Sequence, residues 1–223
     1  MTFEEFKPIL AGQFPHLDLG QFQKYQELEG LYEDWNSKIN VISRKDIGGL
    51  YPHHVLHSLS IAAYLQMERP ETFERMQKDG KIKVLDLGTG GGFPGIPLAI
   101  LFPAVHFTLC DSVGKKTIVA KGVAEAIGLK NTTIVNARAE SLDEEFDFVV
   151  SRAVTALDNF YPWVKGKYTD SILYLKGGDI SEEMQALKTK NKLDEKQIRK
   201  WKISNWLTDE YFEDKMVIDI STK

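Results

Sequence analysis

The chain has a single cysteine, Cys110, among its 223 residues, so it can form no internal disulfide and no cysteine-based zinc cluster. Residues 1–7 have neither a basic start nor an apolar core, which argues against a secretory signal peptide. No apolar run approaches the roughly 18 residues that would cross a bilayer. Together these absences predict a cytoplasmic protein with no membrane association.

An excess of positive charge is also lacking, because the formal net charge is −4. This argues against an indiscriminate polyanion binder, although a local basic patch would still suffice for RNA. The motifs G-x-S-x-G, H-E-x-x-H and G-x-x-x-x-G-K-[ST] do not occur, so hydrolase and P-loop nucleotidase functions have no support.

Residues 84–95, Val-Leu-Asp-Leu-Gly-Thr-Gly-Gly-Gly-Phe-Pro-Gly, are the most informative segment present. A short apolar strand runs into a glycine-dense turn, and a helix is expected to begin near Ile96. A strand, a glycine turn and a helix N-terminus form a nucleotide-type cofactor site, because glycine lets the backbone approach the ligand closely.

Two interpretations of the glycines compete. Gly90-x-Gly92-x-x-Gly95, with Asp111 about 20 residues on, fits a dinucleotide fingerprint and hence an NAD-binding oxidoreductase. Asp86-x-Gly88-x-Gly90-x-Gly92 instead places an acid at the strand tip before alternating glycines, which suits a ligand that carries an ammonium group and a sulfonium, such as S-adenosylmethionine (SAM). Asp86 favours SAM, and a tight turn that binds no ligand is a third possibility.

From residue 81 the pattern alternates between strands and helices, which predicts a parallel sheet covered by helices on both faces. Two strand-like stretches near the end predict an antiparallel hairpin at the edge of the sheet. The predicted division is an N-terminal helical extension, 1–80, and a ligand-binding core, 81–223. The candidate strands are 82–87, 105–110, 132–135, 146–151, 171–175, 197–204 and 215–220, and the candidate helices include 20–37, 55–65, 71–78 and 114–127.

Ligands of such sheets bind at the carboxyl ends of the strands, where Asp86, Asp111, Arg152 and Lys176 are expected. An Asp111 carboxylate could accept both ribose hydroxyls of an adenosine cofactor, or it could cap the next helix. Arg152 could orient the cofactor, clamp a phosphate or form a buried ion pair.

Several basic residues could form an RNA-facing rim: Arg44, Lys45, Lys115, Lys116, Lys165, Lys167 and Lys176. Charged pairs of this kind are also common on any solvated surface. His53 and His54 suggest a metal site at first, but adjacent residues on a helix point in different directions. Capping and packing are therefore the expected roles of this pair, and no metal site is predicted.

The segment from Asp86 to Ile100, above all Phe93-Pro94-Gly95-Ile96-Pro97-Leu98, resembles the signature of the RsmG family of 16S rRNA guanine-N7 methyltransferases, also called glucose-inhibited division protein B. The similarity extends along nearly the whole chain, through Trp35-Asn36, His54-Val55-Leu56-His57-Ser58-Leu59, Asp111-Ser112-x-x-Lys115-Lys116, Arg138-Ala139-Glu140, Ser151-Arg152-Ala153 and Leu175-Lys176-Gly177. One departure is His57, where the family pattern has Asp.

The resemblance implies a class I SAM-dependent methyltransferase (Rossmann-like) fold: a mostly parallel, seven-stranded sheet with a C-terminal antiparallel hairpin. It implies methyl transfer from SAM to a guanine N7 of 16S rRNA, within the small ribosomal subunit or an assembly intermediate, by a monomer. The cofactor contacts carried over are Gly88, Phe93, Ala139, Glu140 and Arg152, joined by Asp86, Gly90 and Asp111 from the strand-tip pattern. No general base is expected, since guanine N7 carries no proton.

Other functions remain open on the sequence alone. A class I methyltransferase could act on a protein or a small molecule instead. An NAD-dependent oxidoreductase and a non-catalytic SAM-binding module that holds rRNA are further alternatives.

Overall fold

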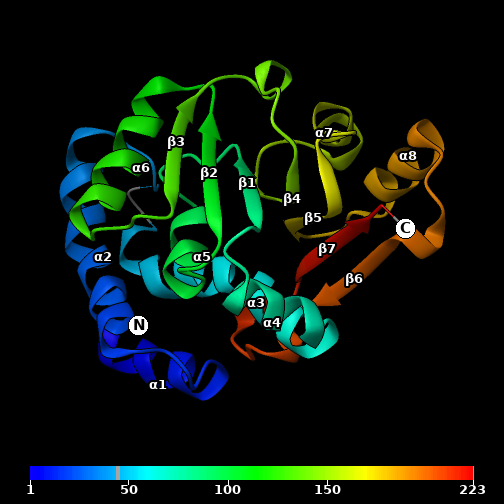
Figure 1. Ribbon diagram of the computed structural model, residues 1–223. Coiled ribbons are helices and arrows are strands. Elements are labelled where there is room, and N and C mark those ends of the chain that lie inside the picture. The colour runs from blue at the N-terminus through cyan, green and yellow to red at the C-terminus, as the bar shows by residue number, and fades with distance from the viewer. Residues whose placement is uncertain (44–45, 223) are drawn as a thin grey trace.

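Seven strands form one sheet in the order β3-β2-β1-β4-β5-β7-β6 (Figure 1). The structure is a computed structural model, which describes residues 1–43 and 46–222. Strands β1 to β5 are parallel, and β7 pairs antiparallel with both β5 and β6. The predicted parallel sheet with an antiparallel addition is therefore confirmed.

The strands lie close to their predicted positions. The first five are Lys83–Leu87 (β1), His106–Asp111 (β2), Thr132–Asn136 (β3), Phe146–Arg152 (β4) and Tyr168–Gly177 (β5). The antiparallel pair is Ile198–Lys202 (β6) and Lys215–Ser221 (β7). Two details differ from the prediction: two 3-10 turns separate β6 from β7, and β7 lies inside the sheet while β6 forms its edge.

Alternation of side chains along each strand gives the sheet two apolar faces. Val84, Phe107 and Phe148 belong to the core on one face, which also contains residues of the N-terminal helices. Leu85, Cys110 and Val149 belong to the core on the other face. Because each face is buried, these strands carry apolar residues at consecutive positions, as is typical of parallel sheets.

The N-terminal helices cover the first face, together with α5 (Gly95–Leu101) and α6 (Gly114–Ala126). Helices α7 (Leu157–Val164) and α8 (Ser181–Asn191) cover the second face, on the yellow and orange side of Figure 1. The N-terminal layer consists of α1 (Phe3–Gln13), α2 (Leu19–Lys38), a π-helix (Leu50–Leu56), α3 (His57–Glu68) and α4 (Pro70–Lys78).

Local sequence explains where the N-terminal helices begin. The side chains of Thr2 and Asp18 accept a hydrogen bond from the backbone N–H of the third residue of α1 and α2, respectively. The side chains of these third residues, Glu5 and Gln21, accept in turn from the backbone N–H of Thr2 and Asp18, which completes a capping box at each helix. Pro70 stands in the first turn of α4, where its missing N–H costs nothing. Helix α2 also holds the glycine-rich loop between β1 and α5, because the buried Tyr32 hydroxyl donates to the Gly91 carbonyl at 2.8 Å.

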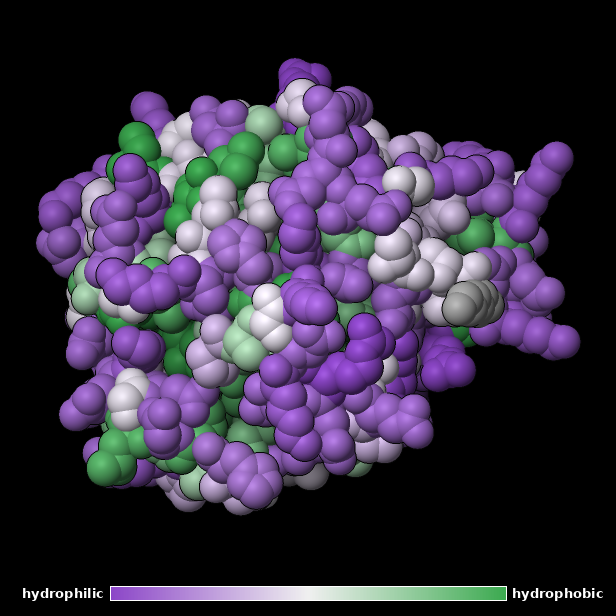
Figure 2. Space-filling model, viewed as in Figure 1, coloured by the Kyte–Doolittle hydropathy of each residue, from purple (hydrophilic) through white to green (hydrophobic). Residues whose placement is uncertain are grey.

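The face of the molecule shown in Figure 2 is mostly hydrophilic, with small apolar areas between the polar side chains. Within residues 1–43 and 46–222, the structure contains no helix that is both long and apolar enough to cross a membrane.

Candidate cofactor-binding site

The glycine-rich segment forms a tight loop between β1 and α5. Gly88, Gly90 and Gly92 all have positive φ, at 75°, 59° and 113°, a region that side-chain-bearing residues avoid. Gly88 also allows a close approach, because a Cβ there would lie 2.2 Å from Cγ2 of Val154. The loop therefore requires its glycines for backbone geometry and for packing against the segment that follows β4.

Asp86, at the tip of β1, is fully buried beneath this loop. Its Oδ2 accepts hydrogen bonds from Thr89 Oγ1 at 2.6 Å and from the Gly95 amide at 2.8 Å. Burial raises the pKa of the Asp86 carboxyl to about 7, although these hydrogen bonds oppose the shift. Its Oδ1 is buried without a hydrogen-bond partner among the described residues. Asp86 therefore braces the loop from below, and its predicted contact with the cofactor stays a prediction.

Asp111, at the tip of β2, is the second acid of the site. Its Oδ2 accepts from the Gly90 amide at 2.9 Å, and its Oδ1 accepts from the Val113 amide at 2.8 Å. The second bond resembles the capping role considered for this residue, since Val113 immediately precedes α6. Unlike Asp86, Asp111 lines a cavity, so its carboxylate can bind a ligand while it holds the loop.

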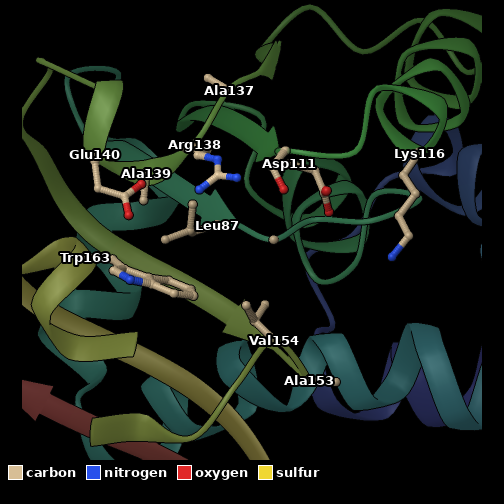
Figure 3. Close-up of a pocket in the computed structure, with 12 residues that line it drawn as sticks. Leu87, Asp111, Lys116, Ala137, Arg138, Ala139, Glu140, Ala153, Val154 and Trp163 are labelled. Carbon is tan, nitrogen blue, oxygen red and sulfur yellow. The ribbon is translucent and has the colours of Figure 1, made fainter. Parts of the chain in front are cut away.

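The cavity lies at the carboxyl ends of β1, β2 and β4 and has a volume of about 430 Å³ (Figure 3). In Figure 3 the Asp111 carboxylate and the Arg138 guanidinium face its middle, and the Trp163 indole lies across from them. The loop after β3 contributes Ala139 and Glu140 to the cavity wall, and their contact with the cofactor stays a prediction. The lining residues are Leu87, Gly88, Asp111, Ser112, Lys116, Ala137, Arg138, Ala139, Glu140, Ala153, Val154 and Trp163.

Phe93 and Arg152 were predicted to contact the cofactor, but their side chains lie behind the loop. Phe93 is buried and stacks on Tyr32, with ring centroids 4.7 Å apart. The Arg152 guanidinium lies over the Phe93 ring, 5.2 Å from its centroid. Arg152 has the same strand parity as Phe148 and Val150, so it points toward the N-terminal helices. Any contact with the cofactor cavity through these two residues remains a prediction.

The buried ion pair considered for Arg152 is not what the structure shows. Its guanidinium donates to the His53 carbonyl at 3.0 Å and approaches Nδ1 of His54 at 2.8 Å. No carboxylate forms a salt bridge with it in the described part of the chain. Arg152 therefore ties the end of β4 to the π-helix.

The expectation that His53 and His54 point in different directions was wrong. Nε2 of His54 lies 2.7 Å from one carboxylate oxygen of Asp46, and Nδ1 of His53 contacts the other. The wider turn of the π-helix allows this convergence. Burial and the nearby charge of Arg152 lower the pKa of His54 to about 4, against the opposing effect of Asp46, so the ring is neutral at pH 7.

His57, the departure from the family pattern, is 6% exposed. Burial, followed by the charges of Arg152 and Lys215, holds its pKa well below the ordinary histidine value. Its Nδ1 lies 3.5 Å from the Tyr211 hydroxyl, and its Nε2 has no hydrogen-bond partner in the described residues. His57 is thus a neutral imidazole that cannot reproduce the charge of an aspartate.

The predicted basic rim is only partly assembled. Lys115 is exposed on α6, and Lys116, one residue on, lines the cofactor cavity. Lys176 ends β5 and pairs with Glu183 at 2.8 Å. Arg44 and Lys45 lie outside the described residues, and RNA contact by any of these five remains a prediction.

Lys165 and Lys167 do not extend this rim. They precede β5, so they lie at the amino end of that strand, whereas Lys116 follows the carboxyl end of β2. The Lys167 ammonium is bound to the Leu142 carbonyl. Sequence order alone could have predicted this separation, because in a parallel sheet the residues before and after a strand lie at opposite edges.

Leu87, Val154 and Trp163 also line the cavity and were not predicted from the sequence. Leu87 could have been found from alternation along β1, but the position of Trp163 depends on how α7 packs. Within the described ranges, no group of three or more His, Cys, Asp or Glu side chains is arranged to hold a metal ion.

The residues present fit an adenosine-type cofactor. Leu87, Ala139 and Trp163 supply apolar and aromatic surface, and Asp111 supplies a carboxylate that can accept from ribose hydroxyls. The missing side chain at Gly88 leaves the backbone accessible at the cavity wall, where any Cβ would strike Val154. Apolar surface together with an acid that can accept from ribose hydroxyls suits a nucleoside.

Solved methyltransferase structures share this fold. A magnesium protoporphyrin IX methyltransferase from Synechocystis, determined with bound SAM, superposes with a TM-score of 0.62 over 93% of this chain and 98% of that one, at 14% identity. A 16S rRNA N2 G1207 methyltransferase from T. thermophilus gives 0.55 over 75% of this chain and 43% of that one, at 15% identity. The fold is therefore that of the class I SAM-dependent methyltransferases.

Sequence relatives narrow the class. Residues 19–206 match the family model for rRNA small subunit methyltransferase G. The ribosomal RNA small subunit methyltransferases G of Flavobacterium psychrophilum and Bacteroides thetaiotaomicron are 46% and 47% identical to this chain over 94% of its length, covering 95% and 97% of theirs. The chain belongs to the rRNA small subunit methyltransferase G family, and its cofactor is SAM, not NAD.

Proposed function

We propose that this protein transfers a methyl group from SAM to N7 of a guanine in 16S rRNA. The observation that carries the proposal is the coincidence of family and site: a chain of this family has a cavity of about 430 Å³ at the strand ends, with Asp111 in its wall. The names of its relatives specify small-subunit ribosomal RNA, and the choice of guanine N7 follows from the family that the sequence resembles.

The residues of the cavity account for binding and orientation. The Asp111 carboxylate, which lines the cavity, would accept from the ribose, and Leu87, Ala139 and Trp163 would supply the surface for the adenine ring. Gly88, Ala153 and Val154 line the same cavity and would hold the remainder of the cofactor. When bound, SAM supplies a methyl group on a positively charged sulfur, which is already activated for transfer.

The acceptor explains why no catalytic base is needed. Guanine N7 has an in-plane lone pair and no proton, so it attacks the methyl carbon directly while the carbon–sulfur bond breaks and its electron pair stays on sulfur. The protein must therefore align the two reactants, and alignment can supply roughly 7–11 kcal/mol of barrier reduction in favourable cases. The target base must also be accessible, either in an exposed loop or flipped out of a helix.

The direct test is methyl transfer from labelled SAM to small-subunit rRNA, followed by nucleoside mass spectrometry. The expected product is 7-methylguanosine, and rRNA from cells without this protein should lack it at one position. Methylation at a different guanine atom, or of protein instead of rRNA, would contradict the proposal.

We further infer that the substrate is rRNA within the small subunit or an assembly intermediate, and that the enzyme acts as a monomer. The net charge of −4 supports a substrate that offers more than naked polyanion. Comparing rates on deproteinised 16S rRNA and on small subunits tests the first point, and sedimentation tests the second.

We also infer that residues 1–80 and 81–223 form one structural unit and do not fold separately. Helix α5 follows the glycine loop within the segment 81–223. All seven of its residues are buried, and the elements that it contacts include α2 and α3 of the N-terminal segment. Tyr25 donates to the Pro97 carbonyl at 2.8 Å. Expression of residues 81–223 alone should therefore give an insoluble or unfolded product, as judged by circular dichroism.

A further inference from the structure

The segment that ends α8 and forms β6 carries an excess of positive charge that the rest of the molecule lacks. Residues 188–202 contain seven basic and two acidic side chains, a formal charge of +5, so the rest of the chain has a formal charge of −9 within the total of −4. None of these side chains lines the cofactor cavity. A local concentration of positive charge in an acidic protein is typical of a surface that binds a polyanion.

Ion pairs account for only two of the seven cations. Lys188 pairs with Glu195 at 2.6 Å, and Lys190 pairs with Asp158 at 2.5 Å. The other five, which we call the basic edge, are exposed and form no salt bridge within residues 1–43 and 46–222: Lys192, Lys196, Arg199, Lys200 and Lys202. Their charges are therefore available to a partner.

The basic edge follows β6 along one end of the sheet (Figure 1). β6 runs in the same direction as β5, because each of them pairs antiparallel with β7. Lys202 lies opposite Met216, which in turn lies opposite Lys176 near the carboxyl end of β5. The basic edge therefore begins level with the side of the sheet that holds the cofactor cavity, and it extends toward the opposite side for about 15 Å, the length of a five-residue strand.

The distance from β6 to the cofactor cavity limits what the basic edge can bind. Strands β5 and β7 separate β6 from β4, so β6 lies about 14 Å from β4 at the usual spacing of neighbouring strands. This distance is too large for the side chains of β6 to contact a base that is being methylated beside the cavity. It is small enough for the RNA on either side of that base to pass over them.

Two ordinary roles of surface charge do not account for the positive sign of the basic edge. Charged side chains on an edge strand prevent pairing with another sheet, and β6 has an unpaired edge within the described part of the chain. Acidic side chains would also prevent such pairing, and they would match the net charge of the rest of the chain. Lysines at a helix C-terminus offset the helix dipole, which applies to α8 but not to β6. The positive sign on β6 therefore favours an anionic partner.

We propose that the basic edge binds the phosphate backbone of the rRNA that flanks the methylated nucleotide. This rests on the proposed function and adds to it a docking surface that is separate from the cofactor cavity. Lysine and arginine side chains that neutralise phosphates release counterions, so this contact weakens as the salt concentration rises. It positions the RNA and carries no sequence information. A local surface of this kind also explains how a chain of net negative charge binds a polyanionic substrate.

Removing charge from the basic edge tests the proposal. In the triple variant Lys196→Gln/Lys200→Gln/Lys202→Gln, the Kd for small ribosomal subunits that lack the methyl group should rise roughly tenfold at about 0.1 M salt. The slope of log Kd against log salt concentration should decrease by about one for each lysine removed. The kcat at saturating subunits and the Kd for S-adenosylhomocysteine should be unchanged, because none of the three residues lines the cofactor cavity. The corresponding triple arginine variant should bind like the unaltered protein, since the charge is kept.

The matched control is Lys78→Gln/Lys81→Gln/Lys130→Gln. It removes the same charge from three exposed lysines that precede β1 and β3 and therefore lie away from the basic edge. Its Kd for the subunits and its salt dependence should equal those of the unaltered protein.

Equal affinities of the basic-edge glutamine variant and the control variant for the subunits would overturn the proposal. So would a loss of binding to phosphatidylglycerol vesicles in the basic-edge variant with unchanged binding to subunits, because the surface would then belong to a membrane contact. Both results leave the proposed function intact if methyl transfer continues. If the unaltered protein binds subunits but transfers no methyl group to rRNA, the proposed function is wrong and this inference falls with it.

Discussion

The tips of β1 and β2 carry the same residue type and use it in opposite ways. Asp86, on β1, is fully buried, and Asp111, on β2, is 8% exposed and lines the cofactor cavity. Both hold the glycine loop, Asp111 through the Gly90 amide and Asp86 through the Gly95 amide. One acid therefore braces the loop from within, whereas the other braces it and also faces the cavity.

The difference comes from what lies above each strand end. The glycine loop folds back over β1 and covers Asp86, whereas the chain after β2 turns away into α6 and leaves Asp111 at the cavity. An acid at a strand tip in a glycine-rich motif is thus not by itself evidence of ligand contact. Substitutions at the two tips should separate stability from cofactor affinity.

The largest effect is expected for Asp86→Ala. It leaves the Thr89 hydroxyl and the Gly95 amide buried without an acceptor, at roughly 1–3 kcal/mol for each stranded donor, or about 2–6 kcal/mol of unfolding free energy. Asp86→Asn keeps an acceptor oxygen and should cost much less. Urea denaturation of both variants measures this, and equal stabilities would show that the carboxylate does not brace the loop.

Gly88→Ala should have the next largest effect, which is a loss of SAM affinity at the tip of β1. The substitution combines a left-handed backbone strain of roughly 1–2 kcal/mol with a Cβ that would lie 2.2 Å from Val154. Gly90→Ala incurs only the strain, since nothing lies within 4 Å of its Cβ. Calorimetry should show SAM affinity reduced more than tenfold in Gly88→Ala and less in Gly90→Ala; the reverse order would place the cofactor elsewhere on the loop.

For Asp111→Ala we expect a loss of affinity more than of stability. Removing hydrogen bonds to a charged acceptor should weaken SAM binding by about 1.5–3 kcal/mol. The melting temperature should fall less than in Asp86→Ala, because Asp111 lies at the cavity wall. Unchanged affinity would mean that Asp111 acts only on the loop and on the start of α6.

The last prediction is a pH dependence that belongs to Asp86. Its pKa is raised to about 7 in the folded state, above the value of about 4 expected on unfolding. Between these values the folded protein keeps a proton that the unfolded chain releases, so this group makes stability fall as pH rises, by up to about 1 kcal/mol per pH unit. The stability of the unaltered protein relative to Asp86→Asn should therefore decrease from pH 5 to pH 8, and a constant difference would contradict the shift.

Much of this fold was predictable because local signals agree with the tertiary structure. Apolar runs bounded by turns located the strands to within a few residues, and the glycine motif located the cavity. Even the direction of Arg152 was available, since its parity with Phe148 and Val150 turns it toward the N-terminal helices. Strand position had instead suggested that it lies at the ligand.

Other features depend on contacts between distant segments. The π-helix brings the side chains of His53 and His54 to the same carboxylate, that of Asp46, which a regular helix would not do. Trp163 enters the cavity through the packing of α7. The seven strands were found from sequence, but their spatial order was not, and that order decides that β7 lies within the sheet.

The insertion of β7 between β5 and β6 has a consequence for how the chain is made. β6 leaves the ribosome before the strand that connects it to the sheet, so it has no neighbour to pair with until β7 has been synthesised. β5 likewise offers an unpaired edge during that interval. The pairing of β5 and β6 with β7 must therefore wait until β7 has been translated. The glycine loop differs, because its partner α2 is translated before it.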